Sequence, residues 1–414
     1  MSKPFPLLPT VGTIPANQIV GRDKDIISLL RLLRSQSVSL EEMRRMGKTL
    51  LLLKLTYLCN KNLLPPELKR EKFKARYFSF QGKQNFGEVI DALHKELKDF
   101  KEWYQIDFTK TYNYIKSAFS IPEIEIGGAK FSLNLPEYKK SWKEIFNKTL
   151  EDIAEAQAKT DGKLILIFDE LPIMLWEWYK EGKHEDAMEL LDMLRERRQM
   201  LETKGIRFIY CGSIGIKVVL NTFRTDFKYT GEPTNEMAEF SLKPFSKEES
   251  DFLCECFLLS DFKLTNEEKP VCLKLVHDLS NGLPFYISQI FNLLQTEFDY
   301  EITEGNIQAA YGLILTDPKY HKAFKQLMDR IEIYYSATKR AEMIKILNEV
   351  SRLDDFISEE ELFTRLDIPD ENAFNESLYI LLSDHYLTRE FRGEQRFYKF
   401  RYQLFKKWWR INKA

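Results

Sequence analysis

The sequence predicts an α/β fold with a parallel sheet at its centre, followed by a helical region and a mixed C-terminal module. Three observations carry this prediction. A loop at residues 42–49 joins a short β-type run at residues 36–40 to an apolar helical pattern at residues 50–55. A continuous apolar run at residues 164–168 ends in two carboxylates, and another at residues 207–213 ends in a small polar residue. Continuous apolar runs of this length are typical of parallel strands that are buried on both faces.

The loop at residues 42–49 has the pattern of a phosphate-binding loop, with one departure. Backbone N–H groups at the start of the following helix would cradle phosphates. Lys48 is placed to reach the β- and γ-phosphates, and Thr49 is placed to hold Mg²⁺. Glu42 stands where the pattern G-x-x-x-x-G-K-[ST] has its first glycine. That glycine eases a turn whose backbone angles side chains resist, so the departure bears on loop geometry and on turnover.

The strand at residues 164–168 ends at the edge where α/β sheets bind ligands. Asp169 is placed to hold the Mg²⁺ shell, and Glu170 is placed to orient and polarise an attacking water. The alternatives are a chance Gly-Lys-Thr at a helix start and a strand that ends in a solvated acidic turn. The two motifs together favour nucleotide binding.

The other elements follow in order along the first half of the chain. Residues 1–18 are rich in proline and are expected to be extended. Further expectations are a helix over residues 26–33, a strand over 73–80, a mainly helical stretch over 86–119, a β-hairpin over 124–135, and helices over 138–159 and 184–203. Alternating strands and helices imply a parallel sheet with helices on both faces.

Beyond residue 246 the β character vanishes, and residues 247–333 show helical patterns separated by turns. From residue 338 onward there are three helical patterns and then two β-like runs around Gly393. Three helices followed by a hairpin predict a winged helix. The predicted division is an extended segment (1–18), a nucleotide-binding core (19–242), a helical lid (243–333) and a winged-helix domain (334–414).

Composition narrows the class of protein. The chain has 414 residues, of which 44% are hydrophobic and 30% are charged, which suits a soluble protein of several domains. The net charge of −2 points to no bulk polyanion partner. The five cysteines have neither metal-site spacing nor a disulfide framework and are expected to be buried packing residues. No apolar stretch reaches the roughly 18 residues of a membrane span, and the N-terminus lacks a signal-peptide pattern. We therefore expect a cytoplasmic protein without membrane contact.

The ordered set of motifs resembles AAA+-related P-loop ATPases of the STAND and archaeal, origin-recognition-like type. The resemblance extends over nearly the whole chain. The segments that carry it are Val20-Gly21-Arg22, Arg44-Arg45-Met46-Gly47-Lys48-Thr49, Phe168-Asp169-Glu170-Leu171-Pro172, Cys211-Gly212-Ser213, Asn281-Gly282-Leu283-Pro284, Phe400-Arg401-Tyr402 and Trp408-Trp409-Arg410. The loop and the acidic strand are specific to P-loop ATPases, whereas the other segments are informative only as a set.

The resemblance implies ATP and Mg²⁺ as cofactors and assigns roles to individual residues. Glu170 would act in hydrolysis. Ser213 would sense the γ-phosphate; the alternative is that it only begins a loop. Thr49 and Asp169 would bind the metal. The nucleotide would be bound by Val20, Gly21 and Arg22 beside the adenine, by Arg45, Met46, Gly47, Lys48, Thr49 and Leu50 around the phosphates, and by Pro284 in the lid. A lid arginine is not evident in residues 281–285.

Two groups of arginines leave alternatives open. Arg44 and Arg45 add positive charge beside the phosphates, point to solvent, or pair with Glu41 and Glu42, and we favour structural or interface pairing. Arg195, Arg197 and Arg198 follow the acidic strand, where an arginine finger for a neighbouring subunit sits in some AAA+ rings. We favour a solvated helix face for these three arginines.

The charges of the winged helix weigh against sequence-specific DNA binding. Its candidate recognition helix, residues 369–385, contains acidic residues and neither Lys nor Arg. Affinity for DNA depends mainly on Lys and Arg that neutralise phosphates. The segment that follows, residues 389–413, is basic and aromatic. It would bind backbone phosphates non-specifically, pair with the acidic half of its own domain, or contact a partner protein. We favour protein contact.

Three functions remain open from the sequence. The first is an ATP-binding and ATP-hydrolysing switch whose nucleotide state controls assembly with a protein partner or a second copy of the chain. The second is an ATPase that binds duplex DNA non-specifically through its basic tail. The third is a nucleotide-binding scaffold with little hydrolysis. The family's frequent role in microbial genome conflict and defence suggests such a context, which no residue here specifies.

Overall fold

A computed structural model describes residues 3–10, 12, 14–98, 108–119, 141–366, 368 and 370–414. The chain divides into two compact units. The sheet unit consists of Asp23–Glu41 and Thr49–Ser241, and the C-terminal unit consists of Met1–Arg22, Glu42–Lys48 and Leu242–Ala414. The loop Glu42–Lys48 therefore groups with the C-terminal part of the chain. The predicted division into four parts stays a prediction.

In the described residues, the sheet unit is built on five parallel strands, which confirms the predicted parallel sheet. Their order is β2-β3-β4-β1-β5, and every neighbouring pair is parallel. The strands are β1 (Val38–Leu40), β2 (Phe73–Ser79), β3 (Lys163–Asp169), β4 (Ile206–Cys211) and β5 (Ala238–Phe240). Because all five run the same way, their carboxyl ends meet at one edge of the sheet. The strand that precedes the loop and the acidic strand thus end at this edge.

Burial explains which strands could be predicted. Every residue of β3 from Leu164 to Asp169 is buried, which matches its continuous apolar run. Strand β1 begins at Val38, two residues later than the predicted run at 36–40. Strand β5 was not predicted, because Ala238, Glu239 and Phe240 form neither an apolar run nor a clear alternation.

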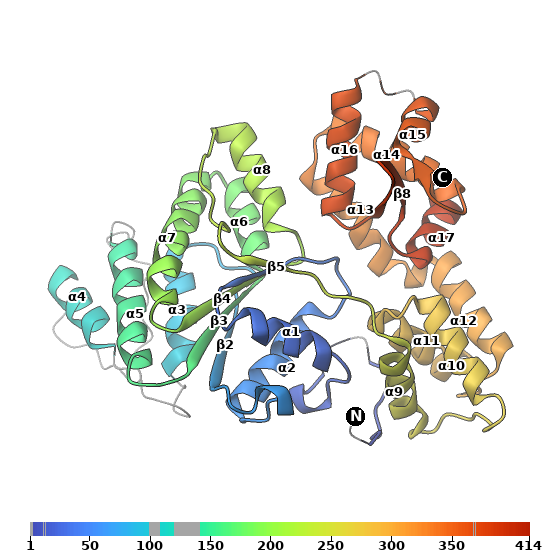
Figure 1. Cartoon of the computed structure of the whole chain (residues 1–414), viewed down its shortest axis with the longest axis horizontal. Helices are drawn as coiled ribbons and strands as arrows, with labels where there is room; N and C mark the ends of the chain where they lie inside the picture. Colours follow the sequence, from blue (N-terminus) through green and yellow to red (C-terminus); the bar gives the residue numbers. More distant parts are fainter. Residues whose placement is uncertain are drawn as a thin grey trace. The chain divides into compact units, whose positions relative to one another are not determined.

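Helices cover both faces of the sheet, with α1 and α2 on one side and α6, α7 and α8 on the other (Figure 1). The helices are α1 (Asp23–Leu32), α2 (Lys48–Asn60), α3 (Phe86–Lys98), α4 (Thr109–Phe119), α5 (Trp142–Gln157), α6 (Leu171–Lys180), α7 (His184–Glu202) and α8 (Ile216–Phe227). The stretch predicted as mainly helical corresponds to α3 and α4. The predicted hairpin at 124–135 lies outside the described residues.

Five helices form the first part of the C-terminal unit. They are α9 (Lys247–Leu258), α10 (Lys269–Ser280), α11 (Pro284–Glu297), α12 (Glu304–Thr316) and α13 (Lys322–Tyr334). A capping box starts α9: Ser246 accepts from the backbone of Glu249, whose side chain accepts from the backbone of Ser246. The extended N-terminal segment is tied to α9, since the backbone N–H of Leu7 donates to the carbonyl oxygen of Cys256 over 3.0 Å.

The end of the chain has the architecture of a winged helix, as predicted. Its helices are α14 (Ala337–Arg352), α15 (Glu359–Arg365), α16 (Glu371–Ser383) and α17 (Gln403–Asn412). Its antiparallel sheet has the order β6-β8-β7, from β6 (Ile357–Ser358), β7 (Leu387–Arg392) and β8 (Gln395–Phe400). Gly393 has a φ of 65° in the two-residue turn between β7 and β8, a conformation that favours glycine.

Aromatic and ionic contacts join the winged helix to the helices before it. Trp408 of α17 stacks on Phe324 of α13 with ring centres 4.8 Å apart. Arg330 of α13 pairs with Asp384, 3.0 Å apart, and both side chains are buried. All five cysteines are free and buried, which confirms the expected packing role. Among the described residues, no helix is both long and apolar enough to cross a membrane.

Candidate nucleotide-binding site

The loop Glu42–Lys48 needs left-handed backbone angles at two positions, and neither is Glu42. Arg45 has a φ of 71° and Gly47 a φ of 84°, whereas Glu42 is not among the residues with positive φ. Glycine adopts such angles freely, and for a residue like Arg45 they cost about 1–2 kcal/mol. The expected turn strain at Glu42 was therefore wrong, because the departure from the pattern falls where the backbone accepts a side chain.

Lys48 is the first residue of α2 and is held by its own loop. Its Nζ donates to the carbonyl oxygen of Glu42 over 2.6 Å and to that of Met43 over 2.8 Å. The residue is only 7% exposed. Its ammonium thus lies at the start of a helix, where backbone N–H groups and the helix dipole favour an anion.

In the sheet unit, Thr49 and Asp169 are in direct contact. Thr49 Oγ1 donates to Asp169 Oδ2 over 3.0 Å, and Tyr77 at the sheet's edge strand donates to the same oxygen over 2.7 Å. Asp169 is buried at 2% exposure, whereas Thr49 is exposed. Burial, reinforced by the Asp169 charge, raises the pKa of Tyr77 well above its ordinary value, so its hydroxyl stays protonated as a donor.

This pair suits a small hard cation. Mg²⁺ prefers oxygen ligands, and it is commonly held by one or two protein groups together with phosphates and water. Thr49 and Asp169 offer a hydroxyl and a carboxylate on the same side of the sheet unit. No group of three or more His, Cys, Asp or Glu side chains suited to a metal occurs in the described residues. The residues present therefore fit a magnesium ion brought with a nucleotide rather than a metal bound by protein ligands alone.

Glu170 lies in a left-handed conformation, with φ 59° and ψ 24°, immediately before α6. Its Oε2 accepts two hydrogen bonds from Ser213, one from the backbone N–H and one from Oγ, both over 2.9 Å. Its own backbone N–H donates to Asp169 Oδ1 over 3.1 Å. Left-handed conformations of residues other than glycine are often found at functional sites, where the surrounding structure enforces them.

The close approach that places Ser213 beside Glu170 requires the preceding glycine. A Cβ on Gly212 would lie 2.7 Å from Cδ of Pro172, the second residue of α6. Only a residue without a side chain allows the end of β4 to pass the start of α6 so closely. Ser213 therefore contacts the side chain of the residue proposed to orient water, a pairing that sequence patterns did not predict.

Gly21 and Arg22 pack against the loop and the start of α9. The Arg22 guanidinium donates to the carbonyl oxygens of Met46 and Lys243, each over 2.5 Å, and lies 4.7 Å from the ring centre of Phe245. A Cβ on Gly21 would meet that ring at 2.9 Å. Val20 is buried beside them at 8% exposure. This segment thus supports the loop from the C-terminal unit.

The start of α11 contacts the same loop. The Arg45 guanidinium lies over the Phe285 ring, 4.6 Å from its centre, and Phe285 follows Pro284 at the start of α11. Arg45 Nε is buried and has no hydrogen-bond partner among the described residues. The Arg45 guanidinium therefore packs against the residue that follows Pro284.

The structure differs from the sequence-based expectations for Glu42 and Arg198. Glu42 pairs with Arg401, near the end of the chain, over 2.8 Å. Arg198 was expected on a solvated helix face, and this was wrong, because its side chain is fully buried and donates to the carbonyl oxygen of Asn235 over 2.6 Å. A buried guanidinium cannot serve a neighbouring subunit.

The sequence reasoning missed three residues that contact the candidate site. Tyr77 could have been found, because it lies near the end of a predicted strand at the ligand-binding edge. Arg401 was recognised only as part of a weak motif. His385, whose Nδ1 accepts from Arg401 Nη1 over 2.7 Å, carried no signal at all.

Comparisons with known proteins identify the fold. No model of a protein family matches the sequence, and neither does any curated protein. A Walker-type ATPase of Pyrococcus abyssi superposes with a TM-score of 0.58 at 18% identity, over 97% of this chain and 99% of the other. The ORC2 protein of Aeropyrum pernix, solved in ADPNP–ADP complexes, superposes with a TM-score of 0.53 at 14% identity, over 95% of this chain and 92% of the other.

These likenesses agree with the resemblance noted from the sequence motifs. Identities this low show that the fold is shared and do not show that the activity is shared. The chain has an α/β fold with an AAA+-like five-stranded parallel sheet, a helical region and a C-terminal winged helix, similar to an archaeal Walker-type ATPase and an archaeal origin-recognition protein.

Proposed function

We propose that this protein binds ATP with Mg²⁺ and hydrolyses it. The observation that carries the proposal is the 3.0 Å hydrogen bond between Thr49 Oγ1 and Asp169 Oδ2, because it joins the two residue types that hold Mg²⁺ in P-loop ATPases. The fold supports it, since one of the similar structures is a Walker-type ATPase and the other was solved with nucleotide.

The residues divide the chemistry between them. Lys48 and the N–H groups at the start of α2 would hold the phosphates, with Arg45 adding positive charge. Thr49 and Asp169 would hold Mg²⁺, which neutralises phosphate charge when bound. Glu170 would orient the attacking water and accept its proton, and Ser213 keeps that carboxylate in place through two hydrogen bonds. Val20, Gly21, Met46, Leu50 and Pro284 would complete the nucleotide site.

The nucleotide state would act as a switch for assembly with a partner protein or a second copy. Support comes from the grouping of the loop Glu42–Lys48 with the C-terminal unit. Met46 is bound by Arg22, and Arg45 rests on Phe285 of the lid. A ligand that moves the loop would therefore change its contacts with Arg22, with Phe285 of α11 and with Arg401 of the winged-helix domain. Such a change would alter the surface that the C-terminal unit offers to a partner.

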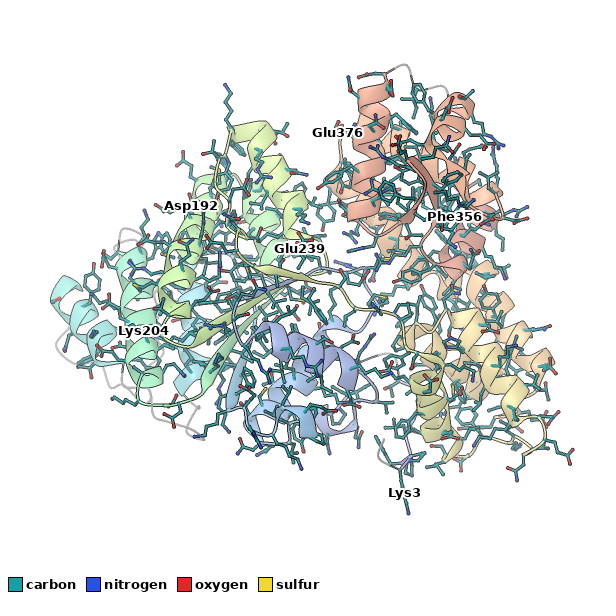
Figure 2. The ribbon with its side chains drawn as sticks, viewed as in Figure 1. Lys3, Asp192, Lys204, Glu239, Phe356 and Glu376 are labelled. Carbon is teal, nitrogen blue, oxygen red and sulfur yellow. The ribbon has the colours of Figure 1, made fainter. Side chains whose placement is uncertain are left out.

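Protein contact is favoured over DNA because five of the nine cations in residues 389–413 already contact carboxylates of this chain. The cations of this segment that contact carboxylates are Arg392, Arg396, Arg401, Lys406 and Arg410. Two further contacts are with Phe356, labelled in Figure 2, whose ring centre lies 4.1 Å from Lys399 Nζ and 5.4 Å from the Arg392 guanidinium. Helix α16 presents carboxylates such as Glu376 (Figure 2).

Replacement of Lys48 with alanine tests the proposal. Calorimetric titration of the full chain with ATP in the presence of Mg²⁺ should show binding. The Lys48→Ala variant should show none. Lys61→Ala, in an exposed residue just after α2, is the matched control and should bind like the parent protein. The mass in solution should change with ATP in the parent and not in Lys48→Ala.

The outcomes separate the remaining alternatives. Equal nucleotide affinity of the parent and Lys48→Ala would contradict the assignment of the site. Binding without turnover in the parent would leave a nucleotide-binding scaffold. Turnover that rises with duplex DNA would favour the DNA-associated ATPase.

A further inference from the structure

The carboxylate of Glu42 is buried inside the proposed phosphate-binding loop, where a phosphate-binding pattern has an uncharged glycine. Its side chain is fully buried. Oε1 accepts from the backbone N–H of Met43 over 2.9 Å, and Oε2 accepts from Arg401 Nη2 over 2.8 Å. Arg401 is thus a direct ionic partner of the loop, although the two residues lie 359 positions apart.

An unpaired charge at this position would oppose a phosphate ligand. Lys48 Nζ donates to the backbone carbonyl oxygen of Glu42 over 2.6 Å, and the charge of Lys48 opposes the rise in the pKa of the Glu42 carboxyl that burial causes, so this carboxylate and the proposed phosphate-binding ammonium interact directly. Like charges a few ångströms apart repel strongly where burial limits the screening by water. Burial raises the pKa of Glu42, and Arg401 is the strongest of the groups that oppose this shift.

The Arg401 guanidinium is held by its surroundings in the C-terminal unit. Its backbone N–H donates to the carbonyl oxygen of Tyr386 over 2.9 Å. Nη1 donates to His385 Nδ1 over 2.7 Å, and Nε donates to the Tyr402 hydroxyl over 3.1 Å. Each edge of the planar group is therefore occupied, and Nη2 faces Glu42. A guanidinium fixed in this way is arranged in advance for a carboxylate.

We propose that Arg401 is a positioning residue of the nucleotide site, which cancels the charge of Glu42 so that the loop can accept phosphate. The winged helix would then supply part of the nucleotide site in the same chain. This inference rests on the proposed nucleotide binding and deepens it. It also gives a role to Glu42, which replaces the first glycine of the phosphate-binding pattern. The loop would accept phosphate only while Arg401 of the winged-helix domain is paired with Glu42.

Affinity for ADP and Mg²⁺, measured by calorimetry on the full chain at pH 8, tests the proposal. Arg401→Gln should bind at least about tenfold more weakly, since it leaves an uncompensated carboxylate. Arg401→Lys keeps the charge and should stay within about threefold of the parent. Glu42→Gln should bind as tightly as the parent or more tightly, and the double variant Glu42→Gln with Arg401→Gln should return to within about threefold of the parent.

The matched control is Arg396→Gln. Arg396 lies on strand β8 just before Arg401 and pairs with Glu359 over 3.1 Å, away from the loop, so its loss should leave ADP affinity unchanged. Thermal unfolding without nucleotide shows whether each variant is folded. If Arg401→Gln does not fold, the double variant and Glu42→Gln decide the question, since both lack the unpaired charge.

Two results would overturn the inference. One is a loss of affinity in Glu42→Gln equal to that in Arg401→Gln, which would assign the pair a purely structural role. The other is a double variant as weak as Arg401→Gln alone. Failure of the parent to bind ADP, or binding that survives Lys48→Ala, would instead contradict the proposed nucleotide site.

Discussion

Replacement of Ser213 with alanine should slow ATP hydrolysis through Glu170 rather than through the phosphates. Ser213 donates to Glu170 Oε2 from both its backbone N–H and its hydroxyl, each over 2.9 Å. Alanine removes only the hydroxyl contact. A hydrogen bond to a charged group contributes about 1.5–3 kcal/mol, which corresponds to about 10- to 100-fold in kcat if the contact is needed in the transition state.

A double-mutant cycle distinguishes this role from direct phosphate sensing. Steady-state phosphate release gives kcat for the parent, Ser213→Ala, Glu170→Gln and the double variant. Glu170→Gln should lose about 10² to 10⁴ in rate while nucleotide affinity is kept. If Ser213 acts through Glu170, adding Ser213→Ala to Glu170→Gln should change kcat by less than about twofold.

One outcome of this double-mutant cycle would refute the reasoning. A full 10- to 100-fold loss from Ser213→Ala in the Glu170→Gln background would mean that Ser213 acts on the nucleotide directly, as the family resemblance implies. Ser35→Ala is the matched control, because Ser35 is an exposed serine whose hydroxyl donates only to the nearby carbonyl oxygen of Leu32. Its kcat should equal that of the parent.

Two further predictions concern pH and DNA. Burial lowers the pKa of His94 to about 4, and because the folded value lies below the ordinary value near 6.5, up to about 3 kcal/mol of stability should be lost as pH falls from about 6.5 to 4. Chemical denaturation of the parent and His94→Gln at several pH values gives the free energy of unfolding, which should fall over this pH range only in the parent. The same dependence on pH in both proteins would contradict the prediction. Any duplex binding should be insensitive to base sequence and fall steeply between about 50 and 200 mM salt. In fluorescence anisotropy, the triple variant Arg392→Ala, Arg396→Ala and Lys399→Ala should weaken duplex binding for all sequences and flatten the salt slope. Asn372 and Asn375 are the side chains of the candidate recognition helix best suited to read bases, so a strong sequence preference that is lost on changing either of them would overturn this expectation.

Sequence patterns predicted those elements whose structure is determined by residues close together in the chain. The strand at residues 163–169 is buried on both faces, so its continuous apolar run predicted both its existence and its carboxylate end. Because parallel strands share one ligand-binding edge, the motifs after β1, β3 and β4 could be assigned to the same edge. The winged helix was likewise predicted from the order of its helical and β-like runs.

Contacts between distant segments could not be predicted, because they depend on how complete elements pack. The buried Arg198 looks like any solvated helical arginine in the sequence, and its burial depends on the carbonyl oxygen of Asn235, which is 37 positions away. The three residues of β5 form a strand only because β1 offers an unpaired edge.

The sequence by itself determined the fold class, the parallel sheet and the loop and carboxylates proposed for the nucleotide site, since these follow from apolar periodicity and short motifs. Only the tertiary structure showed that Glu42 avoids a left-handed conformation and pairs with Arg401. A buried charge in a loop destabilises the structure unless an ionic partner compensates it. In this protein that partner is Arg401, which the packing of the C-terminal unit brings to Glu42.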